Sequence, residues 1–206
     1  LEAGKAILDY SKQHSNIRST FAGHWIIGLG YLAKGEFQLS IDSLMTAVQI
    51  AKDPFYAITA KHFLGICYIL SAQFDKAEDV IQEAITYSQK YGCELFGNMN
   101  IGFQGVLMIL EGHMSKGLSQ IVETLQTFKD KECKATCGIF EYLLGKTYSQ
   151  IATGTKPAFS IMVKNIGFLA KNVPLAKRRA EEHLKQAIEI SNEIGMKGFL
   201  GMSYLD

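Results

Sequence analysis

Residues 65–84 read GICYILSAQFDKAEDVIQEA, and this stretch decides the fold because the chain repeats its pattern. Residues 28–47, GLGYLAKGEFQLSIDSLMTA, match it with Gly, Tyr and Phe at offsets 0, 3 and 9, small residues at offsets 7, 12 and 19, and Leu or Ile at offset 16. Residues 105–124, GVLMILEGHMSKGLSQIVET, form a third copy with Met at the two aromatic offsets. Three copies in one register indicate a helical repeat.

The spacing within one copy predicts two antiparallel helices. The leading glycine falls in the first helix, and the small residues at offsets 12 and 19 fall in the second, so that the two helices can approach closely. Leu or Ile at offset 16 fills the space beside that contact. Gly or Ala at offset 7 falls at the turn, where a left-handed residue often ends a helix.

A fourth copy is interrupted. It opens with Gly145 and Tyr148, and its second half follows as Ala180, Leu184 and Ala187. Gly145 and Ala180 are 35 residues apart where the other copies use 12, so about 23 residues are inserted, at 153–176.

The insertion itself contains a predicted helix at residues 157–171. We expect its Ile161, Ile166 and Leu169 to cover apolar surface, and Asn172 to Pro174 to end it before a new helix begins. A fifth copy starts at Gly201 and Tyr204.

The predicted elements follow from this register. The full repeats are expected at about 20–54, 55–94, 95–133 and 134–194, with partial repeats at 1–19 and 195–206. The first helix is expected to be the second half of an earlier repeat, with Ala3, Ile7 and Tyr10 at offsets 12, 16 and 19. The remaining helices are expected at 20–34, 37–52, 55–71, 74–91, 95–111, 115–130, 134–152 and 175–194.

Composition excludes several classes of protein. Apolar residues make up 48% of the 206 and charged residues 20%, which is enough to bury a core and argues against disorder. The net charge is +1, so we expect no nucleic-acid partner and no membrane-surface binding. The most apolar stretch, residues 101–110, is too short to span a bilayer. Four scattered cysteines favour a reducing compartment, and we expect a cytoplasmic protein.

The repeats resemble the tetratricopeptide repeat family, over nearly the whole chain apart from the insertion. The resemblance implies an all-α fold, a right-handed α-α superhelix with one helical insertion in the fourth repeat. The leading glycines are 37, 40 and 40 residues apart, which exceeds the usual 34, and Trp25 is displaced by one position from the family's tryptophan. Because the chain begins and ends inside a repeat, we expect a fragment of a longer protein.

The resemblance also implies a partner-binding groove on the first helices. Its positions are three residues before each leading glycine and one, four and five after it, and the residues we select there are Trp25, Leu29, Leu32, His62, Ile66, Ile69, Val106, Ile109, Tyr142 and Lys146. Three repeats give an apolar lining and the fourth a polar one. These residues could receive an apolar helix or could be ordinary core between repeats, and the pattern leaves both open.

No catalytic, cofactor or metal site is expected. Cys133 and Cys137 share a helix face but lack the paired spacing or nearby histidines of zinc sites. The five histidines form no pair or triad, and His62 is the one at a groove position. Gly28 and Gly30 loosely match a dinucleotide fingerprint, but they fall inside a helix rather than after a strand.

The stretches IMVKNIGFLAKNVP (161–174) and AEEHLKQAIEI (180–190) resemble the C-terminal repeats of large bacterial signalling proteins. Those proteins join a class III nucleotide cyclase or a kinase-like module to an AAA-type ATPase. The resemblance implies a non-catalytic regulatory domain that binds a protein, a peptide or neighbouring domains and controls an upstream ATPase or cyclase. A free-standing adaptor and a small-ligand receptor or enzyme are the alternatives. A homodimer through the insertion helix is also expected.

Overall fold

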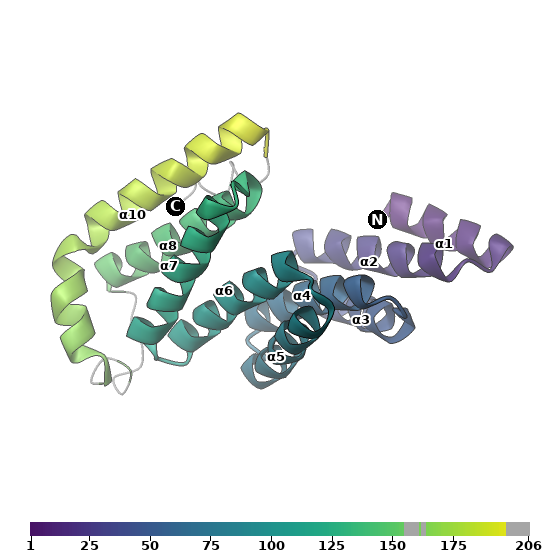
Figure 1. Ribbon diagram of the computed structural model, residues 1–206, viewed down its shortest axis with the longest axis horizontal. Coiled ribbons are helices and arrows are strands. Elements are labelled where there is room, and N and C mark those ends of the chain that lie inside the picture. The colour runs from purple at the N-terminus through teal and green to yellow at the C-terminus, as the bar shows by residue number, and fades with distance from the viewer. Residues whose placement is uncertain (155–160, 162–163, 197–206) are drawn as a thin grey trace. The chain divides into compact units, whose positions relative to one another are not determined.

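The computed structural model describes residues 1–154, 161 and 164–196, and all regular secondary structure in these ranges is helical. The described helices are α1 (Glu2–His14), α2 (Ile17–Ala33), α3 (Phe37–Ile50), α4 (Pro54–Leu70), α5 (Phe74–Tyr91), α6 (Glu94–Leu110), α7 (Met114–Asp130), α8 (Lys134–Thr153) and α10 (Ile166–Ile194). Figure 1 shows their order along the chain. Predictions for residues 155–160, 162–163 and 197–206, including the fifth copy at Gly201 and Tyr204, lie outside the described residues.

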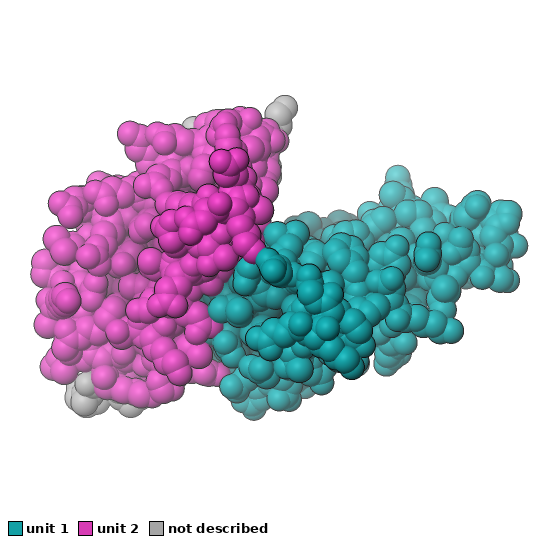
Figure 2. Space-filling model, in the orientation of Figure 1, with its two compact units in different colours: residues 1–107 teal, residues 108–206 magenta. Residues whose placement is uncertain are grey.

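The chain divides into two compact units, residues 1–107 and 108–206, which Figure 2 shows in separate colours. In the first unit each of α1 to α5 packs on the helix that follows or precedes it. In the second unit α7 packs on α8, and α8 packs on α10. This sequential packing of antiparallel helices is consistent with a helical repeat.

The turns within the repeats have the predicted backbone. Gly35, Ala72 and Gly112 occupy offset 7 of three copies, and their φ angles are +73°, +57° and +88°. Glycine adopts this left-handed conformation without steric cost, whereas alanine does not. The expected turn residue is therefore confirmed in each uninterrupted copy.

The close contact between paired helices is also as predicted. A methyl group on Gly28 would lie 2.6 Å from Leu44 Cγ, and one on Gly65 would lie 2.8 Å from Ile81 Cγ1. These are the residues at offsets 0 and 16. Ser40, Ala47, Ala77 and Ala84, at offsets 12 and 19, are buried. The third pair, Gly105 and Ile121, spans the two units and stays a prediction.

The fourth copy keeps this contact across the insertion. A methyl group on Gly145 in α8 would lie 2.7 Å from Leu184 Cγ in α10, and Ala180 and Ala187 are buried beside it. The insertion therefore lengthens the connection between two helices without changing how they pack.

The predicted register of α1 is wrong by one residue. Tyr10 is 52% exposed, whereas Gly4 and Ser11 are buried. Gly4 lies against Ile27, and Gly23 of α2 lies against Leu8. Because both helices contribute a glycine to this contact, the two backbones approach each other at Gly4. The small residues that face α2 are therefore Gly4 and Ser11, each one residue later than the predicted Ala3 and Tyr10.

The predicted break at residues 172–174 is also wrong. The helix α10 continues through Pro174, and Figure 1 shows it bent between a short first arm and a longer second arm. A proline inside a helix removes one hydrogen bond and commonly bends the helix instead of ending it. Asn172 stabilises this region, because its side chain donates to Phe168 O at 2.8 Å and accepts from Arg179 at 2.7 Å.

The insertion packs on the turn between α6 and α7. The Asn165 amide donates to Gly112 O at 2.6 Å, and Ile161 Cγ1 would lie 3.0 Å from a methyl group on Gly112. Leu169 is half-buried, but Ile166 is 71% exposed. Of the three apolar residues expected to cover surface, Ile166 therefore does not.

Candidate functional site

The ten residues selected for a groove are not exposed as a set. His62 and Tyr142 are buried, and the other eight are half-buried: Trp25, Leu29, Leu32, Ile66, Ile69, Val106, Ile109 and Lys146. Trp25 of α2 packs edge-on against Phe63 of α4, with ring centroids 6.0 Å apart. In the first unit these positions thus contribute to the packing between neighbouring repeats.

His62 is enclosed by aromatic rings. The centroids of Phe63, Phe96 and Phe103 lie 5.0 to 5.4 Å from its imidazole. Its Nδ1 lies 3.1 Å from Asn100 Oδ1, and Asn100 Nδ2 donates to Phe96 O, so His62 Nδ1 is the donor. Burial lowers the pKa of His62 from 6.5 to about 4, against the opposing effect of the Asn100 hydrogen bond. The ring is therefore neutral at pH 7.

Exposed apolar side chains gather at one end of the first unit. Because α1 to α6 are antiparallel, the C-terminal ends of α1, α3 and α5 and the N-terminal ends of α2, α4 and α6 meet there. Six of the nine exposed large apolar residues of this unit lie at that end, which we call the helix-end surface, and each is 40 to 52% exposed: Tyr10, Ile17, Phe55, Tyr87, Tyr91 and Leu95. The predicted groove contains none of them.

Helix caps position the residues of this surface. Asn16 caps α2, with its side chain accepting from the backbone of Arg18 and Ser19. Asp53 caps α4 by accepting from Phe55 N at 2.9 Å, and Pro54 occupies the first helical turn. Such caps begin both helices at fixed residues.

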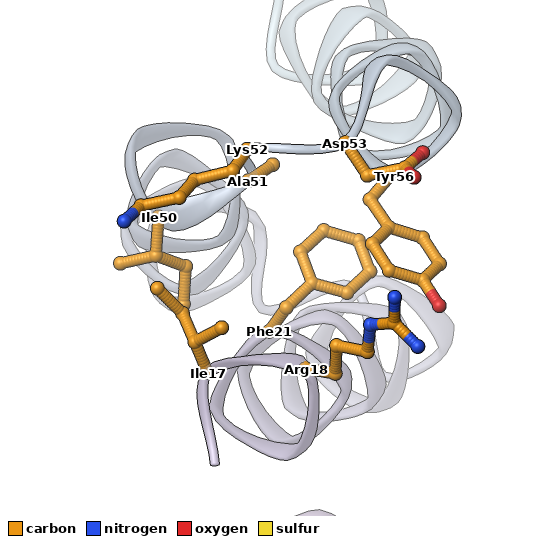
Figure 3. Close-up of a pocket in the computed structure, with 8 residues that line it drawn as sticks. All are labelled: Ile17, Arg18, Phe21, Ile50, Ala51, Lys52, Asp53 and Tyr56. Atoms are coloured by element: carbon orange, nitrogen blue, oxygen red, sulfur yellow. The ribbon is translucent and has the colours of Figure 1, made fainter. Parts of the chain in front are cut away.

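A cavity of about 280 Å³ opens on the helix-end surface, shown in Figure 3. Its lining comes from the start of α2, the end of α3 and the start of α4: Ile17, Arg18, Phe21, Ile50, Ala51, Lys52, Asp53 and Tyr56. Phe21 and Tyr56 stack with centroids 4.8 Å apart. Figure 3 shows Ile17 and Ile50 facing these rings, the Arg18 guanidinium beside the Tyr56 hydroxyl, and the Lys52 ammonium on the far side of the cavity from Arg18.

A second cavity, of about 220 Å³, lies across the same loop. It shares residues 51–53 with the first and adds Val48, Pro54, Ala57, Lys61, Tyr87 and Tyr91. Tyr87 and Tyr91 are one helical turn apart, with ring centroids separated by 5.7 Å. The loop between α3 and α4 thus separates two hollows, the first with a mainly apolar wall and the second with a mainly polar one.

The charges on this surface are mainly positive. Lys61 pairs with Glu83 at 2.5 Å and lies over the Tyr87 ring. Among the described residues, neither the Arg18 guanidinium nor the Lys52 ammonium forms an ion pair, and Asp53 serves as a helix cap. Two cations therefore remain available beside the cavities.

The second unit holds a buried ionic cluster. Glu141 of α8 is fully buried, 2.7 Å from Lys129 Nζ of α7 and 2.6 Å from His183 Nδ1 of α10. Burial alone would raise the pKa of Glu141, but hydrogen bonds from His183 and Lys129 outweigh it and lower the pKa. His183 stacks on Tyr148, whose ring also faces Arg179. These groups join three helices.

Neither metal-binding clusters nor membrane-spanning helices are found in the part of the chain that the structure describes. No three His, Cys, Asp or Glu side chains there lie close enough to hold a metal ion. None of the helices in the described ranges is long and apolar enough to cross a membrane.

Comparison with known proteins found no family model that matches the chain and no curated protein with detectable sequence similarity.

Sequence reasoning missed the helix-end surface because it selected residues by the family's groove positions. One signal was present: Tyr87 and Tyr91 are polar-face positions of an otherwise charged helix, and Phe55 directly follows a cap and a proline. Large aromatic residues at such exposed places often mark binding surfaces.

Proposed function

We propose that this chain is a non-catalytic interaction domain built from helical repeats of the tetratricopeptide type. The observation that carries the proposal is the helix-end surface, where six large apolar side chains are exposed and three of them, Ile17, Tyr87 and Tyr91, line two cavities. Aromatic residues are enriched in protein interfaces because they bury a large area with few rotatable bonds. The repeat register supports the family, since the glycine contacts recur in three helix pairs.

The domain belongs, in this proposal, to a larger signalling protein. The resemblance of residues 161–190 to the C-terminal repeats of bacterial cyclase and ATPase proteins supports that setting. Partner binding would then alter ATP hydrolysis or cyclic nucleotide formation by an upstream module. A free-standing adaptor is the alternative, and the sequence that flanks residues 1–206 in the gene distinguishes the two.

Site-specific photo-crosslinking tests the interaction. A benzoyl-phenylalanine at position 91 in the whole gene product should give a covalent adduct with a partner protein in cells. Position 79, exposed on the other half of α5, is the matched control and should give none. Adducts in equal yield from both positions, or from neither, would contradict the proposal.

A second surface favours self-association through the insertion. Ile166, Ala170 and Val173 are all exposed on the first arm of α10, and their spacing of four and three residues puts them on one face. We propose that this stripe supports a homodimer. Light scattering after size exclusion should then give twice the mass of one chain, and Ile166→Ser with Val173→Ser should reduce it to one chain. A monomeric parent chain contradicts this proposal.

A further inference from the structure

We propose that the helix-end surface binds an acidic peptide segment that places one apolar side chain in the first cavity and one polar side chain in the second, on either side of residues 51–53. This inference rests on the proposed interaction function and names the chemistry of the partner. It concerns a surface distinct from the groove positions, which are half-buried or buried.

The size of the cavities argues for single side chains. Pockets for cofactors and drug-sized ligands usually measure about 300 to 1,000 Å³. The two hollows measure about 280 and 220 Å³, and each is open to solvent on the surface. Each suits one large side chain, and two hollows on either side of one loop suit two side chains of the same extended segment.

The walls of the two cavities differ, and they argue for one apolar anchor and one polar side chain. In the first hollow the stacked rings of Phe21 and Tyr56 face Ile17 and Ile50, and the wall is mainly apolar. In the second hollow Tyr87 and Tyr91 lie opposite the α3–α4 loop, but most of the exposed wall is polar. Anchors of interfaces are commonly aromatic or aliphatic side chains that fill hollows like the first.

The charges argue for acidic flanking residues. The cavities are lined by the cations Arg18, Lys52 and Lys61 and by one carboxylate, Asp53, which caps α4. Lys61 already pairs with Glu83, so Arg18 and Lys52 are the cations that a partner can reach. Figure 3 places them on opposite sides of the first cavity. Carboxylates of a bound segment beside these two cations would set its orientation and speed its association.

A peptide fits these features better than a nucleic acid or a lipid surface. Phosphate-binding surfaces usually carry many cations, whereas the whole chain has a net charge of +1 and the cavities are lined by two available cations. The apolar first hollow has no counterpart in a phosphate backbone.

The test uses a phage-displayed library of random 16-residue peptides, selected on the immobilised 206-residue chain. Enriched peptides are synthesised with a fluorophore, and their dissociation constants are measured by fluorescence polarisation. We expect peptides with one apolar residue flanked by Asp or Glu, and weaker binding at higher salt.

Charge reversal supplies the variant and its control. Arg18→Glu with Lys52→Glu should weaken binding about tenfold or more, because two attractions become repulsions at a partly desolvated surface. Lys5→Glu with Lys34→Glu changes the net charge equally at exposed sites on the opposite end of α1 and α2, and should leave binding unchanged. Circular dichroism confirms that both variants are folded. Tyr91→Ala should weaken the same peptides without any change in charge.

The other outcomes separate the two proposals. Peptides without acidic residues, or peptides weakened equally by both charge variants, overturn this inference and leave the interaction function standing. A library that enriches no peptide also overturns it. A 20-nucleotide single-stranded DNA and phosphatidylserine vesicles are measured in parallel. If either binds and loses binding with Arg18→Glu and Lys52→Glu as the peptides do, the surface is a general anion binder and the peptide inference fails.

Discussion

Among the described residues, each unit buries one histidine or carboxylate side chain, and the two units do so in opposite ways. In the first unit His62 is buried among phenylalanine rings and is kept neutral. In the second unit Glu141 is buried and kept charged by Lys129 and His183. A buried group is tolerated either by losing its charge or by pairing it. The two units should therefore respond differently to substitution and to acid.

The largest expected effect is the loss of Glu141. Glu141→Ala leaves Lys129 and His183 without their shared partner, and we expect the second unit to lose about 3 kcal/mol of stability at pH 7. The lower end of the usual range applies because both partners are partly exposed. Hydrogen exchange of α8 and α10 measures the loss for this unit alone.

An exposed pair between the same two helices gives the control. Lys134 and Glu193 bridge α8 and α10 with both side chains 56% exposed. Glu193→Ala should cost less than about 1 kcal/mol, since exposed ion pairs contribute little. Equal losses from the two substitutions would show that burial of Glu141 has no special role.

The pH dependence should distinguish the units next. The pKa of His62 is lowered in the folded state, so between about 4 and 6.5 the unfolded chain binds more protons and acid destabilises the fold. From pH 7 to pH 5 the first unit should lose about 2 kcal/mol. Trp25, the only tryptophan, reports on this unit by fluorescence during urea unfolding.

Glu141 acts in a lower pH window. Its pKa is lowered from 4.5, so its contribution is complete above that value and is lost as the pH falls through the folded-state pKa. His62→Gln should remove the loss between pH 7 and 5 in the first unit, while Glu141→Ala should leave it. A slope that persists in His62→Gln would rule out His62 as its source.

The glycine contacts offer a smaller test between the units. A methyl group on Gly145 would meet Leu184 Cγ at 2.7 Å and Leu184 N at 3.1 Å, whereas one on Gly65 meets side-chain atoms of Ile81 only. Backbone cannot move aside as a side chain can, so Gly145→Ala should cost about 2 kcal/mol and Gly65→Ala less than about 1 kcal/mol. Chemical denaturation of both variants measures the difference. A larger loss from Gly65→Ala would reverse this argument.

The smallest expected effect is an increase in the stability of the first unit. Ala72 has φ +57°, whereas its counterparts in the first and third copies are glycines. Ala72→Gly should stabilise the first unit by about 1 kcal/mol, because it relieves a left-handed alanine at some cost in unfolded-state entropy. The midpoint of urea unfolding followed by Trp25 should rise. An unchanged or lower midpoint would mean that the turn is not strained.

Local patterns predicted the helix pairs well because they depend on residues close in sequence. The turn residues at offset 7 and the contacts of Gly28 and Gly65 follow from spacing within one copy. Even Gly145 and Leu184 were paired correctly, because the second-helix pattern at 180–187 is intact. In each case the side chain that fills the contact can be identified by the number of residues that separate it from a glycine or an alanine.

The incorrect or missing predictions concern features that depend on contacts between residues far apart in the sequence. Pro174 normally signals a helix end, but packing of α10 on α8 keeps the helix continuous through it. The register of α1 depends on Gly23 in the next helix. The cluster of Glu141, Lys129 and His183 joins three helices and has no local pattern. The helix-end surface collects its six residues from the ends of five helices.

The pairing of α8 with α10 has a consequence for the backbone between them. Gly145 and Leu184, Glu141 and His183, and Tyr148 and Arg179 all bridge these helices through side chains outside residues 155–160. These three contacts therefore do not require an intact peptide backbone in that interval, which serves them by raising the effective concentration of one helix near the other. A chain cut by a protease within the interval should elute as one particle, and its two pieces, produced separately, should reassemble when mixed.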